Sequence, residues 1–444
     1  MPRRSRSSRT RHPTSAAPSG RAGRDVPSPA GPSLAAVTSA IVPSFRKRNA
    51  RWEGYVRLQP VLAGIVTALV GFSSAFAVVL TGLRAAGADE RQAASGLLVL
   101  CLTCGLVTLA LGLHHRIPIS IAWSTPGAAL LISTGPPPGG FPAAAGAFLV
   151  CGALVVVAGL VPAVGRLIAL IPVPIASAML AGVLVELCIA PVRALAEIPV
   201  LAAPVIAVWA LVGRFARTWA VPAALVVAAV AIALTGPGLG DVAITPALVW
   251  TTPTFDLATV VGVGIPLFLV TMASQNLPGA AVLAQYGYSA PMRPILTTTG
   301  LATIVSAPFG GHAVNLAAIS AALVAGPDAH PDPRRRWVAA VTAGVGLAVL
   351  GLGAGLAAAL LVLSPPVLIE AVAGLALLGA LAGALSSAVS SPDRREAAAT
   401  TFVVTAAGVG FLGIGAAFWG LLAGVGVSLL HRRRAPADAV TSPR

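Results

Sequence analysis

The chain has 444 residues, of which 57% are hydrophobic and only 10% are charged, and its mean hydropathy is +0.89. An ordinary soluble domain carries charge on about a quarter of its residues, so this composition excludes one. The net charge of +15 does not indicate nucleic acid binding. Twelve of the 29 Lys and Arg residues precede residue 58, and no basic surface interleaved with aromatic residues follows.

The amino-terminal 50 residues are rich in Arg, Ser, Pro and Ala and show almost no apolar periodicity. This composition predicts a disordered, basic cytoplasmic tail at residues 1–50, although a dispensable extension is an alternative interpretation. The basic cluster Arg46-Lys47-Arg48 with Arg51 predicts that the amino end lies in the cytoplasm. A second short cytoplasmic tail is expected at residues 432–444.

Apolar runs of about 20 residues recur from Gln59 almost to the end, which is typical of a polytopic helical membrane protein. We predict fourteen spans. All but three of the 29 Lys and Arg residues then fall on the cytoplasmic side, so both termini are expected in the cytoplasm of a bacterium, with the chain in its inner (plasma) membrane. The spans lie near 59–81, 93–113, 118–132, 142–163, 172–189, 199–213 and 219–235, then 259–285, 294–306, 309–324, 337–360, 365–388, 398–412 and 414–431.

Fourteen spans divide into two sets of seven, residues 58–235 and 259–431. Because seven is odd, the second set starts from the opposite side of the membrane and has the inverted orientation. Breaks at corresponding positions indicate such an inverted repeat. Span three is interrupted at Ser124 to Gly127, and span ten, seven later, at Pro308 to Asn315. The fold class expected is therefore an all-α membrane protein of 7+7 inverted repeats with broken helices at spans three and ten. The alternative is that Gly and Pro are simply common in membrane helices.

Span eight carries three polar residues in a row, Ser274, Gln275 and Asn276, before Pro278. Unpaired amides are costly in hydrocarbon, so this segment is expected to line a cavity enclosed by protein. The amino ends of the two broken helices would point at each other near the same place, and their free N–H groups favour an anion. Ser124 and Thr125 would begin one half-helix, and Gly310, Gly311 and His312 the other. The candidate substrate-binding residues are Phe72, Ser73, Ser124, Thr125, Pro126, Ser274, Gln275, Asn276, Gly310, Gly311, His312 and Asn315.

Spans one, three, eight and ten contain no Asp or Glu, which favours an anionic substrate over a cation. Proton coupling needs a titratable group, and His312 is the only histidine near the expected site. Glu186 and Glu370 lie in corresponding spans five and twelve, where a charged group is costly and is by default functional. The alternatives are a purely structural His312 and glutamates that reach the membrane surface.

Other chemistries find no support in the sequence. His114, His115 and His330 lie in loops without a carboxylate cluster at metal-binding spacing, so no metal site is expected. No G-x-x-x-x-G-K-[ST] loop occurs, which argues against an ATP-driven pump. No catalytic arrangement of Ser, His and Asp stands out, so we expect neither an enzyme nor a cofactor.

Several segments together resemble the benzoate membrane transporter (BenE) family: AWSTPGAALL (122–131), PLFLVTMASQNLPG (266–279), YSAP (288–291), APFGGHAVNLAAISAAL (307–323), AGLALLGAL (373–381) and GAAFWGLLAG (415–424). The resemblance covers most of residues 58–431. It implies a benzoate/proton symporter whose architecture is similar to that of uracil permeases and sulfate-type anion transporters. By that similarity, spans 1–4 and 8–11 form a core domain, spans 5–7 and 12–14 form a gate domain, and a homodimer can form through the gate.

The nucleobase relatives carry carboxylates in spans eight and ten, where this chain has Gln275 and Asn315. This difference weakens a nucleobase interpretation. The sequence therefore predicts secondary active transport of benzoate or a similar aromatic carboxylate with protons, by alternating access across the lipid bilayer. The alternatives are an inorganic-anion or nucleobase carrier on the same scaffold, and a passive anion channel.

Overall fold

The computed structural model describes residues 58–161, 163, 172–235, 245, 247–411 and 414–432. The predicted tail at residues 1–50, and residues 433–444 of the second predicted tail, lie outside the described residues.

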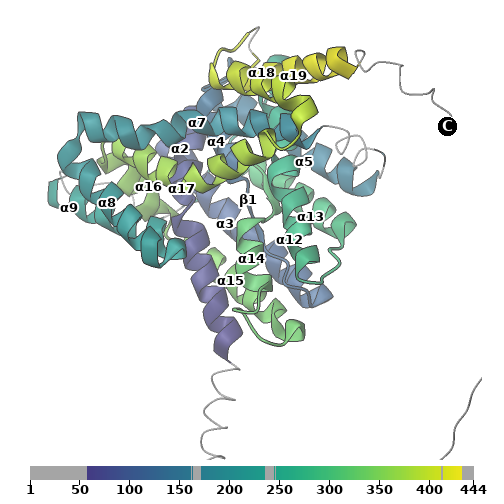
Figure 1. The fold of residues 1–444 in the computed structure, drawn as a ribbon. Helices are drawn as coiled ribbons and strands as arrows, with labels where there is room; N and C mark the ends of the chain where they lie inside the picture. The colour runs from purple at the N-terminus through teal and green to yellow at the C-terminus, as the bar shows by residue number, and fades with distance from the viewer. Residues whose placement is uncertain are drawn as a thin grey trace, which may run out of the picture. The chain divides into compact units, whose positions relative to one another are not determined.

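The described residues are mostly helical, with one pair of short strands lying among the helices (Figure 1). A helical segment at residues 58–73 leads into the first labelled helix. The elements that follow are α2 (Phe76–Ala85), α3 (Glu90–His115), β1 (Ile121–Trp123), α4 (Thr125–Thr134), α5 (Gly140–Leu160), α7 (Val173–Glu197), α8 (Pro199–Phe215), α9 (Ala220–Thr235), α10 (Leu257–Thr259), α11 (Ile265–Thr271), α12 (Leu277–Gln285), α13 (Met292–Ser306), β2 (Val314–Leu316), α14 (Ile319–Ala325), α15 (Trp337–Gly351), α16 (Ala354–Leu363), α17 (Pro366–Ala388), α18 (Arg395–Ala406) and α19 (Ala416–Arg432).

Seven helices in the described part of the chain are long and apolar enough to cross a membrane: Leu58–Ala85, Glu90–His115, Gly140–Leu160, Val173–Glu197, Arg217–Thr235, Leu257–Gln285 and Pro366–Ala388. Pro333–Gly351 and Ala354–Leu363 form a further apolar pair that bends by 55°. Helices α8 and α19 are apolar but shorter. The protein is therefore a multi-pass helical membrane protein, and the count of fourteen spans stays a prediction.

Helices from the two halves of the chain pack closely on one another: α3 on α15, α5 on α13 and α7 on α17. Glycines permit the first two contacts. A Cβ atom added to Gly105 would lie 2.6 Å from the carbonyl oxygen of Gly344, and one added to Gly300 would lie 2.7 Å from the backbone nitrogen of Val156 and 2.8 Å from the carbonyl oxygen of Gly152. Lipid supplies no hydrophobic force between membrane helices, so their association depends on close packing. Small residues make this packing possible because they let the two backbones approach each other.

The long helix at Leu257–Gln285 contains two π-helical turns, Val260–Gly264 and Met272–Asn276. Each turn ends two residues before a proline, Pro266 in one case and Pro278 in the other. Proline has no N–H, so the carbonyls four residues earlier lose their usual helical donor. The second π turn carries the polar run that begins at Ser274, and turns of this kind are frequent at functional sites.

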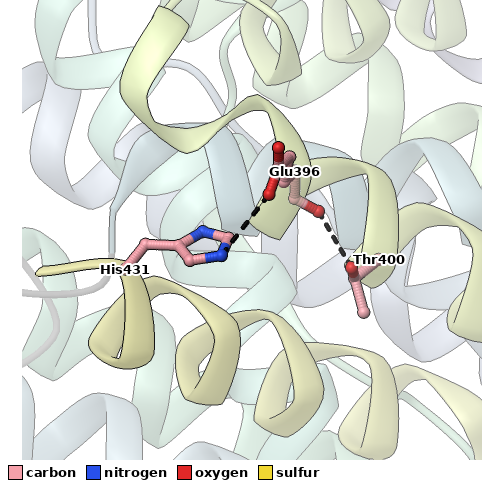
Figure 2. Close-up of polar contacts among 3 residues, drawn as sticks. All are labelled: Glu396, Thr400 and His431. Carbon is pink, nitrogen blue, oxygen red and sulfur yellow. Dashed lines mark hydrogen bonds and ion pairs between the residues drawn. The ribbon is translucent and has the colours of Figure 1, made fainter. Parts of the chain in front are cut away.

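Helices α18 and α19 lie side by side near the end of the described chain (Figure 1). Figure 2 shows an ion pair between them, in which His431 Nε2 lies 3.4 Å from a carboxylate oxygen of Glu396. Thr400 donates a hydrogen bond of 2.9 Å to the backbone carbonyl of Glu396. Both partners of the ion pair are well exposed, so this contact adds little stability compared with the helix packing.

Strands β1 and β2 pair antiparallel, with Ala122 opposite Asn315, and hydrogen bonds of Ser124 N–H to Ala313 O and of Ala317 N–H to Ser120 O extend the ladder. Both strands are buried, so N–H groups on their outer edges also need acceptors.

Two threonines meet that need at equivalent places. Ile121 N–H donates to the hydroxyl oxygen of Thr108 on α3 at 3.0 Å, and Val314 N–H donates to that of Thr303 on α13 at 2.9 Å. Each strand is thus held by the helix that precedes it in the chain.

Asn276 supplies a further acceptor for the strand pair. Its side-chain oxygen accepts the N–H of Leu316 at 2.9 Å, and Asn276 itself is fully buried. The second π turn is therefore attached to β2 through this amide.

Replacing Gly300 by Ala should lower the free energy of unfolding by about 1–3 kcal/mol, because the new methyl group forces α13 away from α5. Thermal unfolding of the purified protein in detergent measures the change. Gly426→Ala on α19 is the matched control, since a Cβ there meets nothing within 4 Å. Equal unfolding temperatures for the two variants would contradict the packing argument.

Replacing Asn276 by Ala should cost about 1–3 kcal/mol of stability, because the Leu316 N–H keeps its burial and loses its acceptor. Ser274→Ala on the same turn is the control, since that hydroxyl donates only to Val270 O in its own helix. The unfolding temperatures of both variants are compared in detergent, and an Asn276→Ala protein as stable as Ser274→Ala would show that the amide does not hold β2.

Candidate functional site

A cavity of about 800 Å³ lies where α4, the turn before α12 and the start of α14 face α7, α17 and α19. Its walls are largely aliphatic, with Leu180, Leu269 and Leu421 among them. Four of the described residues that line it are polar: Ser177, Ser274, Gln275 and Ser387. Size and composition match small-molecule sites, which are mostly apolar and carry a few placed polar groups.

A second cavity of about 100 Å³ lies on the other side of Gln275, between the helical segment at 58–73, α3, β1, α14 and α15. It has room for about three water molecules, at roughly 30 Å³ each. Its lining is richer in polar groups, which favours hydration. The side chains with a hydroxyl or amide are Thr67, Ser74, Thr108, Ser120, Thr125, Gln275 and Ser320.

Gln275 is the predicted site residue that borders both cavities. Its side-chain oxygen accepts the backbone N–H of Ala318, just before α14, at 3.4 Å. With the oxygen engaged, the amide nitrogen can donate to a ligand. Ser274 and Pro126 also line the large cavity, and Thr125 lines the small one.

Ser124 is the N-cap of α4, and it is fully buried. Its hydroxyl oxygen accepts from Gly127 N–H at 3.1 Å and from the hydroxyl of Thr271 at 3.0 Å. The next residue but one, Pro126, has no N–H. The amino end of α4 thus has fewer free donors for an anion than the sequence predicted, because its own side chain caps it.

The expectation that Gly310, Gly311 and His312 begin a half-helix needs correction. Gly310 adopts φ +89° at the end of a short 3₁₀ turn, and strand β2 follows, so the helix α14 begins only at Ile319. The backbone of β2 is committed to β1 and cannot also form helical hydrogen bonds. A glycine is required at the positive φ.

His312 and Asn315 connect β2 to the start of α4 and line neither of the two cavities. His312 Nε2 lies 3.0 Å from the carbonyl oxygen of Ser124, and the histidine is fully buried. Because a carbonyl only accepts, the Nε2 atom carries the proton in this contact. With its amide turned to suit its neighbours, Asn315 accepts Ser124 N–H at 2.9 Å and donates to Leu316 O at 3.0 Å.

Phe72 and Ser73 have packing contacts. The Phe72 ring stacks on Phe76 at 5.2 Å and meets Trp123 edge-on at 6.3 Å. The Ser73 hydroxyl donates to Leu69 O at 2.6 Å within its own helix. Neither residue lines either cavity.

Glu186 on α7 is exposed, and Glu370 on α17 is half-buried. Arg193, Glu186 and Glu197 all lie close enough to Glu370 to interact with its charge, so the two predicted glutamates are near each other. These charges gather near the carboxyl end of α7 and the start of α17, whereas the cavity lies along the opposite parts of both helices.

The sequence interpretation missed Ser177, Ser387 and Ala318, which line the large cavity. Ser177 and Ser387 stand 210 positions apart in apolar helices. Ser177 stands alone among apolar residues and Ser387 follows Ser386, so neither position shows a periodic pattern, and only the packing of α7 on α17 brings the two together.

The family model described as Benzoate membrane transport protein (BenE) matches residues 55–430. The chain is 40% identical over 366 residues to the inner membrane protein YdcO of Escherichia coli K12, covering 82% of this chain and 93% of that protein. It is 28% identical over 376 residues to the benzoate membrane transport protein of Acinetobacter baylyi, covering 83% and 94%.

Two solved structures share the fold at low sequence identity. The transmembrane domain of the cyanobacterium bicarbonate transporter BicA aligns with a TM-score of 0.50 and 17% identity, covering 85% of this chain and 97% of that one. SLC26A9 aligns with a TM-score of 0.57 and 14% identity, covering 93% and 73%. Because the family model spans most of the sequence, the chain belongs to the benzoate membrane transport protein (BenE) family.

Proposed function

We propose that this protein is a secondary active transporter of the bacterial inner membrane that takes up benzoate, or a similar aromatic carboxylate, together with protons. The observation that carries the proposal is the large cavity, with aliphatic walls and the amide of Gln275 at its border. An aromatic carboxylate has the matching chemistry, a flat apolar ring and one anionic group.

In this proposal the ring packs against Leu180, Leu269 and Leu421, and the carboxylate accepts a hydrogen bond from the Gln275 amide nitrogen. Among the described residues that line the cavity there is no Asp or Glu to repel an anion. Of the predicted site residues, Pro126, Ser274 and Gln275 line the large cavity and are the proposed direct neighbours, and Thr125 lines the small cavity. Ser124, His312, Asn276 and Asn315 make buried hydrogen bonds that hold the strand pair and the start of α4 in place.

Alternating access follows if the two sets of elements around the cavity move against each other. The proposed core domain contains α4, the second π turn and α14, and the proposed gate domain contains α7, α17 and α19. Gln275 borders both cavities, so it is the natural place at which a bound substrate would be closed off from one of them.

The contacts between helices support the inverted repeat of residues 58–235 and 259–431. Helices α3 and α15 are the predicted spans two and eleven, and their counterparts in the other set of seven are spans nine and four, which are α13 and α5. An inverted repeat therefore requires an α5–α13 contact equivalent to the α3–α15 contact, and both contacts are present. Thr108 on α3 and Thr303 on α13 occupy equivalent positions in the two repeats, since each accepts a strand N–H. The close glycine contact Gly105–Gly344 between α3 and α15 is likewise equivalent to Gly300–Gly152 between α13 and α5. We therefore retain fourteen spans as part of the proposal. The distribution of Lys and Arg carries the cytoplasmic placement of both termini, and the resemblance to the family carries a homodimer formed through the gate.

Proton coupling rests on the resemblance to the family. The candidate carriers His312, Glu186 and Glu370 lie outside both cavities. Of these, His312 is the one joined to the site, through the carbonyl of Ser124 at the start of α4. Protonation at His312 would therefore act on the substrate through the position of α4.

An inorganic-anion carrier is the second candidate, and the fold shared with BicA and SLC26A9 favours it. The large cavity argues for the aromatic substrate instead. A small hydrated anion would gain little from aliphatic walls of this extent.

Proteoliposomes that contain the purified protein should accumulate labelled benzoate when the lumen is alkaline relative to the medium, because protons moving inward drive the substrate with them. Uptake is measured with and without the pH gradient, and with unlabelled benzoate, bicarbonate, sulfate and uracil as competitors. Accumulation that does not depend on the pH gradient would contradict proton coupling. Displacement of the label only by inorganic anions or uracil would favour a carrier for those substrates. Flux that neither saturates nor leads to accumulation would indicate a channel.

Gln275→Ala should weaken benzoate binding by roughly 10- to 100-fold, which corresponds to a lost hydrogen bond to a charged group of about 1.5–3 kcal/mol. Binding is measured by competition in detergent. The matched control is Gln59→Ala, whose side chain donates to Asp328 O outside both cavities. Wild-type affinity in Gln275→Ala would place the carboxylate elsewhere.

A further inference from the structure

We infer that the large cavity is built for aromatic acids that carry a second polar group on the ring, above all a hydroxyl, and that Ser177 and Ser387 recognise this group. This inference rests on the proposed function, since it assumes that an aromatic carboxylate occupies the cavity. It adds a specificity-determining pair on the wall formed by α7 and α17.

The two serines form a dyad inside the cavity lining. Ser177 Oγ donates to Ser387 Oγ at 3.0 Å, and each is partly buried. They come from α7 and α17, whereas Ser274 and Gln275 come from the π turn on the other side. The cavity therefore has two separate polar places, with Leu180, Leu269 and other aliphatic side chains also lining it.

The chemistry of the dyad suits a hydroxyl partner. A serine hydroxyl is one donor and two acceptor sites, so the Ser177–Ser387 bond leaves the Ser387 proton and lone pairs of both oxygens available. A phenolic hydroxyl also donates and accepts, and it can bond to both serines at once. Benzoate itself places only a C–H edge there, which leaves these groups without a partner in largely apolar surroundings.

The size of the cavity points the same way. An apolar protein cavity of about 150 Å³ is enough to bind benzene. The cavity here is about 800 Å³, so a ring and a carboxylate leave room for further substituents.

A purely structural role for the dyad, holding α7 to α17, makes a different prediction. These two helices already pack along their lengths, and Cys188 Sγ lies 3.7 Å from Gly374 O at another point of the contact. Loss of a structural bond would change stability or the affinity for every substrate equally. Loss of a recognition group would change only the discrimination between substrates.

The test is competition binding to the full-length purified protein with benzoate and with its 2-, 3- and 4-hydroxy derivatives. We expect at least one hydroxybenzoate to bind roughly 5- to 10-fold more tightly than benzoate, as one added hydrogen bond of about 1–1.4 kcal/mol would give. Ser177→Ala and Ser387→Ala should each remove that preference while binding benzoate within about twofold of wild type. The control is Ser133→Ala, whose hydroxyl donates to Leu130 O at 3.0 Å within α4.

Benzoate binding also reports that each variant is folded. If wild type binds all four acids equally, or if both alanine variants keep the preference, the inference is overturned and the proposed function stands. If wild type binds none of the four, the proposed function itself fails and the inference falls with it.

Discussion

The arrangement depends on one constraint, that every buried backbone N–H and C=O away from water needs a partner. Strands β1 and β2 leave the helical pattern inside the bundle, so they pair with each other. Their outer N–H groups are taken up by Thr108, Thr303 and Asn276. These hydrogen bonds fix where α4 and α14 begin, and those helix starts carry Thr125, Pro126 and Ala318 to the edges of the two cavities.

The same constraint shapes the helix at Leu257–Gln285. Prolines at 266 and 278 withhold two helical donors, and a π turn precedes each. In the second π turn, neighbouring polar residues acquire different tasks. Asn276 is buried against β2, Ser274 bonds to its own helix at the large cavity, and Gln275 borders both cavities. Of the three polar residues in this membrane helix, one thus supports the strand pair and two line a cavity.

Membership of the benzoate transporter family and the cavity geometry support each other. The proposed aromatic carboxylate is taken from the family, and the cavity has aliphatic walls with separate polar groups on the π turn and on the α7–α17 wall. The elements that supply those groups pack on different neighbours: α7 packs on α17, and α4 packs on α11, the helix that leads into the π turn, while α7 also contacts α4 and the π turn. A substrate between the α7–α17 wall and the π turn would contact both, so movement of one relative to the other would change its contacts, as alternating access requires.

The amino-acid sequence by itself determined that the chain is a multi-pass membrane protein and which stretches break the helical pattern, because hydrophobic length and the positions of Gly, Pro and polar residues are local properties. It also singled out Gln275. Tertiary structure alone decided which polar residues face a cavity. Ser124 and His312 are 188 positions apart and Ser177 and Ser387 are 210 apart, yet the first pair forms a buried contact between a side chain and a backbone carbonyl, and the second pair lines the large cavity. Hydrogen-bonding partners so distant in the chain are brought together by helix packing. The type of a polar residue alone does not show whether its hydrogen-bonding groups already have partners inside the protein.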